Sequence, residues 1–440
     1  MQQGPGSRYA RATVRDVSVV LEAQDQDMLD GARGAGIALA MRIVVRVAEA
    51  MGATSLLDIT GAHIDSCLYH GPSGVDFVER LGADGAQVAV PSTLNVSSLD
   101  LMQPESFRGD EDVRIDARRL MDGYVALGCV PTWTCAPYQE EQRPGFGEHV
   151  AWAESNAIVF ANSVLGARTH RYGDFIDICA ALTGRAPAAG LHLDDARRGS
   201  VVYRLDALRP ELVDSDVLAP VLGYLIGADC GTSVPVVDGL PPGQPEHRLK
   251  ALGAAAASSG GIGMFHAVGN TPEAPTLTAA LHDGSAERTV EVTASMLREV
   301  KRRLAPPAGA SVGAVCLGTP HYSVEEFRRL HELLAGRSAA PSVVIYVNTS
   351  RSVWHEVQLR GWADELQASG VRVVQDTCTY ITPVMEPFEG LALTDSAKWA
   401  HYAPGNVQVD AAFASVEDCV ESAIAGSVVD STSAWWSDPV

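Results

Sequence analysis

Apolar and polar positions alternate most clearly in the last third of the chain, where runs with the length of strands are separated by stretches with helical spacing. The predicted strands are 311–317, 342–347 and 371–375, and the predicted helices are 323–334, 352–368 and 416–425. Ser323 and Glu326 have the spacing of a capping box at the start of the first helix. Strands that alternate with helices in this way predict a parallel sheet with right-handed crossovers.

The preceding part of the chain shows the same two kinds of pattern. Its predicted helices are 27–51, 74–81, 114–127 and a helix from about Ser155, and its predicted strands are 55–59 and 87–90. Residues 394–402 are predicted as a short loop. No internal repeat or low-complexity linker divides the chain. We therefore predict an α/β protein of two intertwined lobes, 17–305 and 306–426, between loose tails at 1–16 and 427–440.

The composition is that of a folded globular protein, with 46% hydrophobic and only 20% charged residues. The net charge of -21 repels phosphate backbones and anionic membranes, so neither nucleic acid nor a membrane is a predicted partner. No segment has the apolar length of a membrane span, and Met1 to Arg15 lacks the apolar core of a secretory signal. With eight cysteines spread along the chain, these features predict a cytoplasmic protein with free thiols.

Three of the cysteines share a local pattern. Cys135, Cys316 and Cys378 each end an apolar run, and each is followed within five residues by a proline. Three thiolates that converge from separate loops are what an iron–sulfur cluster or another thiolate-rich metal site requires. Because the chain has no Cys-x-x-Cys spacing, buried structural thiols explain the same pattern.

Cys67 is a fourth candidate ligand, because His63, Asp65 and His70 lie beside it on a glycine-bounded stretch. A nucleophilic pair of Cys67 with His70 is an alternative interpretation of these residues. A surface loop with ordinary polar residues is another.

Two further stretches could hold a small polar ligand. Thr93 and Asn95 belong to a loop dense in hydroxyl and amide side chains, and Ser155 and Asn156 stand at a predicted helix start, where free backbone amides attract acceptors. Ordinary helix capping explains both stretches equally well. The glycine-rich segment 260–269 is not a nucleotide loop, because His266 stands where a third glycine is required and no Gly-Lys-Ser/Thr follows.

Together, these stretches resemble the aconitase X family. The motifs that carry the resemblance are residues 63–71, 91–95, 134–138, 154–157, 318–321 and 376–378. Six motifs in this order make the resemblance far more specific than any one of them, and it covers about residues 17 to 425. It implies an aconitase-like, multi-lobed domain with hydro-lyase activity and a [2Fe-2S] or [4Fe-4S] cluster held by three cysteines. The candidates are Cys378, Cys135, Cys316 and Cys67.

Two branches of the family differ in substrate, cis-3-hydroxy-L-proline in one and mevalonate 5-phosphate in the other. Residues 66–71 and 145–157 are more similar to the hydroxyproline branch. The other branch tends to carry a cysteine where this chain has Thr319, which implies that Cys316 or Cys67 takes its place. The resemblance also implies a small swivelling domain or subunit that supplies a catalytic serine. A non-catalytic, cluster-bearing subunit of a complex is a further alternative.

The resemblance and the residue types together suggest roles for individual side chains. The candidates for proton handling, or for hydrogen bonding to a cluster-bound hydroxyl, are His63, Asp65, His266 and His321. The candidates for substrate binding are Ser73, Thr93, Asn95, Ser155, Asn156 and Lys398. A buried histidine or an ordinary cap is the alternative in each case.

Overall fold

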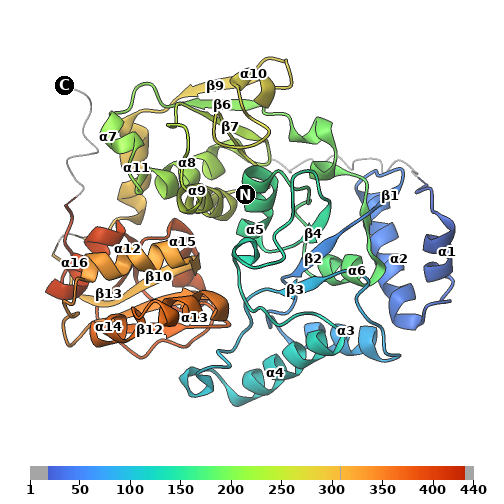
Figure 1. Ribbon diagram of the computed structural model, residues 1–440, viewed down its shortest axis with the longest axis horizontal. Helices are drawn as coiled ribbons and strands as arrows, with labels where there is room; N and C mark the ends of the chain where they lie inside the picture. Colours follow the sequence, from blue (N-terminus) through green and yellow to red (C-terminus); the bar gives the residue numbers. More distant parts are fainter. Residues whose placement is uncertain (1–17, 308, 432–440) are drawn as a thin grey trace, which may run out of the picture.

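The computed structural model describes residues 18–307 and 309–431, so the predicted tail at 1–16 lies outside the described residues. The elements form three regions along the sequence, shown in blue to green, green to yellow, and orange to red in Figure 1. Each region has its own sheet of parallel strands and a separate apolar cluster. Among the described residues, no helix is both long enough and apolar enough to cross a membrane.

The first region surrounds a three-stranded parallel sheet with the order β3-β2-β4. Its elements are α1 (Ala23–Leu29), α2 (Ala35–Ala50), β1 (Leu56–Asp58), β2 (Gly61–Ile64), α3 (Pro72–Gly82), β3 (Ser92–Leu94), α4 (Glu111–Ala126), β4 (Val150–Trp152), α5 (Ser155–Phe160), α6 (Ile176–Thr183) and β5 (Arg185–Pro187). The apolar face of α2, which includes Ile37, Met41 and Val44, lies in the core of this region.

The second region has a four-stranded parallel sheet with the order β8-β7-β6-β9. Its elements are β6 (Val201–Arg204), α7 (Pro210–Val213), α8 (Leu218–Cys230), β7 (Pro235–Asp238), α9 (Glu246–Ser259), β8 (His266–Ala267), α10 (Leu277–Ala280), β9 (Arg288–Glu291) and α11 (Ala294–Leu304). Helices α8 and α9 pack closely because Gly223 and Gly227 bring the backbone of α8 against that of α9.

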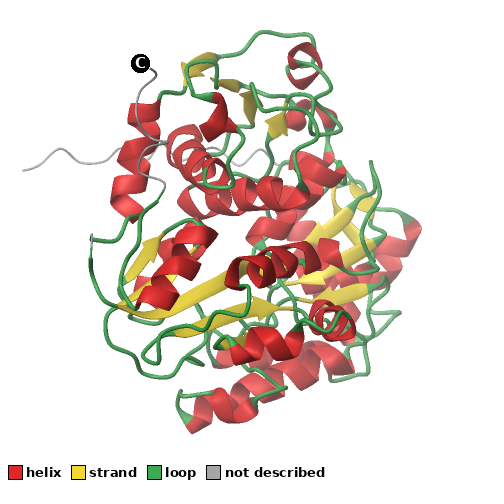
Figure 2. Cartoon of the chain, turned by 60° about the vertical axis from the view of Figure 1, so that its left-hand side comes forward, coloured by secondary structure: helices red, strands yellow, loops and turns green. Residues whose placement is uncertain are grey.

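The third region is a doubly wound parallel sheet with the order β12-β11-β10-β13-β14. Its elements are β10 (Val312–Tyr322), α12 (Val324–Leu334), β11 (Val344–Thr349), α13 (Arg351–Leu359), α14 (Ala363–Ala368), β12 (Val371–Val374), β13 (Leu391–Thr394), α15 (Ala397–Asn406), β14 (Ala411–Phe413) and α16 (Val416–Ala425). Helices α12, α13, α14 and α16 cover one face and α15 covers the other. Figure 2 shows this sheet with helices on both sides.

The predicted α/β class and the parallel C-terminal sheet are confirmed. The helix predicted over 416–425 has those bounds in the structure. Helix α12 begins with the predicted capping box, in which Ser323 and Glu326 each bond the other's backbone N–H. These features were predictable because they depend on local sequence alone.

Several local predictions were wrong. The helix predicted over 27–51 is two helices, because Gly31 and Gly34 adopt positive φ angles between α1 and α2. The helix predicted over 352–368 is likewise interrupted, at Gly361. Residues 87–90 form no strand, and the pairing strand is β3, a few residues later. Residues 394–402 contain most of α15 rather than only a loop, because the Ser396 side chain caps that helix.

The most consequential difference concerns β10, which was predicted to end at 317. The strand continues to Tyr322, with a shift of its register against β11 between Leu317 and Tyr322. Cys316 therefore lies inside the strand, and His321 lies near its end. The strand order also makes β10 the point from which the sheet is wound in both directions, toward β11 on one side and β13 on the other.

Candidate metal centre

Three buried side chains from three separate segments meet near the carboxyl ends of β10 and β12. Cys135 lies in the loop before the short helix η2 (Pro137–Gln139), His321 lies near the end of β10, and Cys378 lies in the loop after β12. Their potential ligand atoms all lie within 4.8 Å of one another. In the described part of the chain, this is the group of His, Cys, Asp and Glu side chains that has the spacing of a metal site.

Hydrogen bonds fix the His321 ring beside the two thiols. Its Nε2 lies 3.3 Å from the backbone oxygen of Thr377, and its Nδ1 lies 3.0 Å from the hydroxyl of Thr134. Because a carbonyl oxygen only accepts, Nε2 carries the proton, and Nδ1 accepts from the Thr134 hydroxyl. Burial lowers the pKa of His321 to about 3, so the ring is neutral at physiological pH. A histidine that donates its second N–H to a carbonyl has the usual arrangement of a metal ligand.

The two thiols provide a test of whether a metal fits. Burial and the neighbouring Cys135 raise the pKa of Cys378 well above its ordinary value. The backbone N–H of His321 donates to Cys135 Sγ over 3.3 Å, so this sulfur already has one hydrogen-bond donor. Two thiolates side by side in a dry site repel each other, and a bound cation removes that penalty. A Cys2His donor set suits iron–sulfur or zinc chemistry.

A buried ion pair lies beside this group and joins the first region to the third. The Lys398 ammonium contacts the Glu154 carboxylate, and the two side chains are 3% and 5% exposed. Glu154 is the N-cap of α5, where its carboxylate accepts from the backbone N–H of Ala157 over 2.7 Å. Burial lowers the pKa of Lys398, but Glu154 and other nearby groups more than offset this effect, so its pKa lies well above the ordinary value. Lys398 is therefore charged.

The residues around Glu154 extend the contact to the metal group. Asn156 donates through Nδ2 to Glu154 and, over 2.7 Å, to the backbone oxygen of Cys135. Ser155 Oγ lies 3.3 Å from Lys398 Nζ. The structure thus brings the predicted residues Ser155, Asn156 and Lys398 to the same place as Cys135.

A second set of predicted site residues lies next to the group of Cys135, His321 and Cys378. These residues lie on β2, on β3 and directly after these strands. His63 Nδ1 lies 2.8 Å from the hydroxyl of Thr93, and Asn95 donates to the carboxylate of Asp65. Burial lowers the pKa of His63 to about 3. Burial also raises the pKa of Asp65 well above its ordinary value. Among these described atoms, His63 Nε2 and Asn95 Oδ1 are buried without a hydrogen-bond partner.

These two atoms indicate where a ligand would bind. The Thr93 hydroxyl lies 2.8 Å from His63 Nδ1 and 3.5 Å from the backbone oxygen of Ala62, so it can donate to either atom. Hydrogen bonding to the Asn95 side chain opposes the lowering of the pKa of His63 by burial, which places a ring N–H of His63 toward Asn95. Two buried polar atoms with incomplete hydrogen bonding are costly unless a polar group of a ligand reaches them.

The structure places the other predicted site residues outside this group. Cys316 Sγ packs 3.4 Å from the sulfur of Met385, and Cys67 Sγ donates to the backbone oxygen of Ile64 over 3.2 Å. His266 lies on β8 in the second region, with Nε2 2.8 Å from the backbone oxygen of Arg197. Ser73 is exposed in the first turn of α3. All eight cysteines are buried free thiols.

Sequence reasoning did not select Thr134 or Glu154 as site residues. Thr134 is adjacent to Cys135, and its position in a motif was the available signal. Glu154 stands before a predicted helix start, which indicates a cap. Its pairing with Lys398, which lies 244 residues later in the chain, is a product of the tertiary structure.

Comparisons with known proteins agree on one family. The aconitase X first-domain model matches residues 18–195, the second-domain model matches 199–302, and the third-domain model matches 312–425. The crystal structure of Thermococcus kodakaraensis aconitase X (holo-form) superposes with a TM-score of 0.82 at 29% identity, covering 92% of this chain and all of that one.

Three relatives separate into two kinds. The cis-3-hydroxy-L-proline dehydratase of Pseudomonas aeruginosa is 43% identical, over 98% of this chain and 74% of its own length. The protein of the same name from Hypocrea jecorina is 40% identical, over 94% and 70%. The phosphomevalonate dehydratase large subunit of Methanothermobacter thermautotrophicus is 36% identical, over 90% and 96%.

Proposed function

Because this chain belongs to the aconitase X family, we propose that it is a hydro-lyase that removes water from cis-3-hydroxy-L-proline. The observation that carries the proposal is the placement of Cys135, His321 and Cys378 beside a buried lysine and two buried polar atoms that have no hydrogen-bond partner. The choice of substrate rests on the two hydroxyproline dehydratases, which are more similar to this chain than the phosphomevalonate relative.

We infer that the cofactor is an iron–sulfur cluster, [2Fe-2S] or [4Fe-4S], with Cys135 and Cys378 as ligands. The His321 ring supplies a third donor where the sequence led us to predict Cys316 or Cys67. When bound, iron with an open coordination position supplies a Lewis acid for the substrate hydroxyl. The donor set supports this assignment, because soft thiolates and an imidazole are ligands of such clusters.

The chain's own residues bind and orient the substrate. The charged Lys398 binds the carboxylate in exchange for part of its contact with Glu154. Asn95 Oδ1 accepts from the substrate hydroxyl or ring ammonium, and His63 Nε2 forms a hydrogen bond with the substrate hydroxyl. The C2–H proton is removed and the C3–O bond breaks, so proton and hydroxide leave as one water. The resulting enamine takes up a proton on carbon, loses one from nitrogen, and becomes a cyclic imine, a pyrroline-2-carboxylate.

We also propose a small partner, as a subunit or a further domain, that supplies a catalytic serine. The Methanothermobacter relative is named a large subunit, and this chain spans 96% of that protein but 74% of the Pseudomonas enzyme. The part of the longer relative that this chain does not match supports such a partner. The cytoplasm remains the predicted compartment.

The test is anaerobic reconstitution with iron and sulfide, followed by an assay with cis-3-hydroxy-L-proline, with and without a candidate small subunit. Mevalonate 5-phosphate is assayed in parallel. We expect bound iron, visible absorption and turnover of the hydroxyproline. Cys378→Ser should lose the absorption, whereas Cys419→Ser, a buried thiol in the separate core of the third region, should keep it. A protein that gains no iron and stays inactive with its partner would falsify the proposal.

A further inference from the structure

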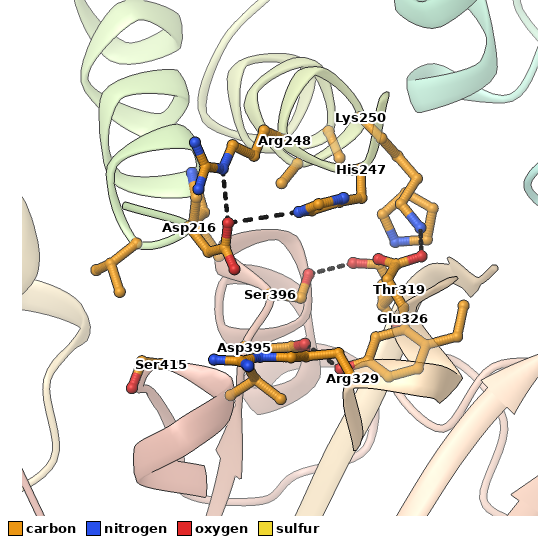
Figure 3. A pocket seen from close by; sticks show the side chains of 18 of the residues that line it. Asp216, His247, Arg248, Lys250, Thr319, Glu326, Arg329, Asp395, Ser396 and Ser415 are labelled. Atoms are coloured by element: carbon orange, nitrogen blue, oxygen red, sulfur yellow. Dashed lines mark hydrogen bonds and ion pairs between the residues drawn. The ribbon is translucent and has the colours of Figure 1, made fainter. Parts of the chain in front are cut away.

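A cavity of about 400 Å³ lies between the second region and the third (Figure 3). Helices α8 and α9 form one wall, and the ends of β10, β13 and β14 with the starts of α15 and α16 form the other. The volume is within the range of about 300–1,000 Å³ that is typical of small-molecule sites. None of Cys135, His321 and Cys378 lines this cavity, so it is distinct from the candidate metal centre.

Its position in the fold is the first argument that it binds a ligand. Neighbouring strands β10 and β13 are followed by helices on opposite faces of the sheet, α12 on one and α15 on the other. The crevice between the carboxyl ends of two such strands is the topological switch point, where open α/β sheets bind their ligands. Thr319 and Tyr322 from β10 and Asp395 and Ser396 from the end of β13 line the cavity at this point. We call it the switch-point cavity.

The charges of the wall define which ligand it suits. Four carboxylates line the cavity, and all except Asp395 are paired with a lining cation. In one of these pairs, Arg248 Nε lies 2.6 Å from Asp216 Oδ1. The other two pairs are Glu326 with Lys250 and Glu325 with Arg328. The opposite charges of each pair cancel within the wall, so these residues favour neither an anionic nor a cationic ligand.

The remaining polar features favour one negative charge. Arg329 lines the cavity but pairs with Glu417, 2.7 Å away, which does not line it. The ten-residue helices α15 and α16 both begin at the wall, with Ala397 and Val416 as first residues. The N-terminus of a helix carries a partial positive charge and free N–H groups. Glu417 and Asp418 in the first turn of α16 offset the charge of that end, whereas the first turn of α15 holds no acidic residue. The start of α15 and the Arg329 guanidinium are therefore the main donors at this wall.

The rest of the wall suits an apolar body and a further polar group. Val217, Pro220 and Phe413 provide apolar surface. The Asp395 carboxyl accepts a hydrogen bond from the hydroxyl of Tyr322, and burial raises its pKa to about 7. At neutral pH this carboxyl can therefore either donate to or accept from a ligand.

We propose that the switch-point cavity is a second ligand site, which binds a small monocarboxylate with an apolar body, such as an amino or hydroxy acid. The carboxylate lies toward Arg329 and the start of α15. The amino or hydroxyl group faces Asp395, and the apolar body contacts the second region. This proposal does not depend on the proposed reaction, because binding to this site requires neither metal nor turnover.

The test measures binding of L-proline to the full chain by calorimetry, before and after reconstitution, with inorganic phosphate as a separate probe. Arg329→Gln removes the cationic side chain, and we expect it to weaken L-proline binding by at least about tenfold. Arg337→Gln is the matched control. Both arginines belong to the segment of α12 and its end and pair with glutamates of α16, but Arg337 does not line the cavity.

A second variant tests the volume of the site rather than its charge. Ala251→Phe places a ring in the cavity from α9 and should abolish binding. Binding that is unchanged in Arg329→Gln and Ala251→Phe but lost in Lys398→Met would assign L-proline to the metal centre and overturn the proposal. No binding of L-proline, or binding of phosphate alone, would overturn it too. Turnover of cis-3-hydroxy-L-proline is tested separately, so the two proposals can fail independently.

Discussion

At the carboxyl edge of the third sheet, the metal centre and the switch-point cavity are separated by only a short segment of β10. His321 belongs to the metal group, while its neighbours Pro320 and Tyr322 line the cavity. On the metal side the side chains are buried, few, and chemically soft. On the cavity side they are charged, largely paired, and partly open to solvent.

The difference shows how one sheet edge can support two kinds of chemistry. A metal site requires dry thiols that a cation stabilises, and here both thiols, Cys135 and Cys378, come from buried loops while His321 comes from β10. A site for a small acid requires a cavity that already exists without the ligand and dipoles, which the start of α15 provides. Lys250 belongs to both sites, because it lines the switch-point cavity and donates to the backbone oxygen of His321 in the metal group.

The largest expected effect comes from breaking the buried ion pair on the metal side. Lys398→Met leaves the carboxylate of Glu154 buried without its partner, which should cost about 3–5 kcal/mol of unfolding free energy. Denaturant unfolding of the metal-free protein measures it. As a control, Arg143→Gln breaks an exposed pair with Glu246 and should cost less than about 1 kcal/mol. Equal losses of unfolding free energy in Lys398→Met and Arg143→Gln would show that the buried ion pair contributes no more than the exposed one.

The next effect concerns the carboxyl of Asp395 on the cavity side. Burial raises its pKa to about 7, and Tyr322 from β10, Glu326 from α12 and Lys250 from α9 are the titratable groups that act on it. The folded state then holds a proton that the unfolded state has lost above pH about 4. The contribution of Asp395 to the unfolding free energy is therefore fully present below pH about 4, and it is lost as the pH rises toward 7.

Asp395→Asn removes this dependence and is measured by unfolding at several pH values. The unfolding free energy of the variant minus that of the parent protein should rise by on the order of 3 kcal/mol from pH 4 to pH 7. Because the comparison is a difference, other titrating groups cancel. A constant difference across that range would show that Asp395 is ionised in the folded protein throughout.

Much of the third region was predictable, but the link between its two sites was not. The parallel strands and the capping box at Ser323 follow from local patterns. The end of β10 does not, because the register shift after Leu317 depends on pairing with β11. That shift decides which side chain reaches the metal group, and it places His321 there while Cys316 stays inside the strand.

The two sites also differ in how much their residues reveal in sequence. Cysteines and histidines that follow apolar runs are uncommon, so Cys135, Cys378 and His321 could be selected. The wall of the cavity consists of serines, prolines and surface ion pairs such as Arg329 with Glu417, which occur on most helices. Only the strand order and the packing of α8 and α9 onto the third region turn them into one site.

Lys250 tests whether the segment between the sites couples them. Its ammonium lies 3.0 Å from the backbone oxygen of His321 and also contacts Glu326. Lys250→Met should loosen the His321 backbone and weaken metal binding by about 10–100-fold, the usual range for residues that orient a ligand. Cobalt(II) binding to the metal-free protein, followed by thiolate-to-cobalt absorption, measures it. Glu326→Gln keeps the bond to the carbonyl and should weaken cobalt binding less. Unchanged cobalt affinity with lowered thermal stability would make Lys250 a structural contact alone.

The smallest expected effect comes from a residue that the sequence selected and that the structure places in solvent. Ser73 is exposed in the first turn of α3, whereas the other predicted binders Thr93, Asn95 and Lys398 are buried. Since no described contact ties its side chain to the metal group, Ser73→Ala should change unfolding free energy by less than about 0.5 kcal/mol. Its KM for cis-3-hydroxy-L-proline should stay within about twofold, measured with the candidate small partner present. A large rise in KM with unchanged kcat would instead show that the partner brings α3 against the substrate, and would move the boundary of the site to this exposed turn.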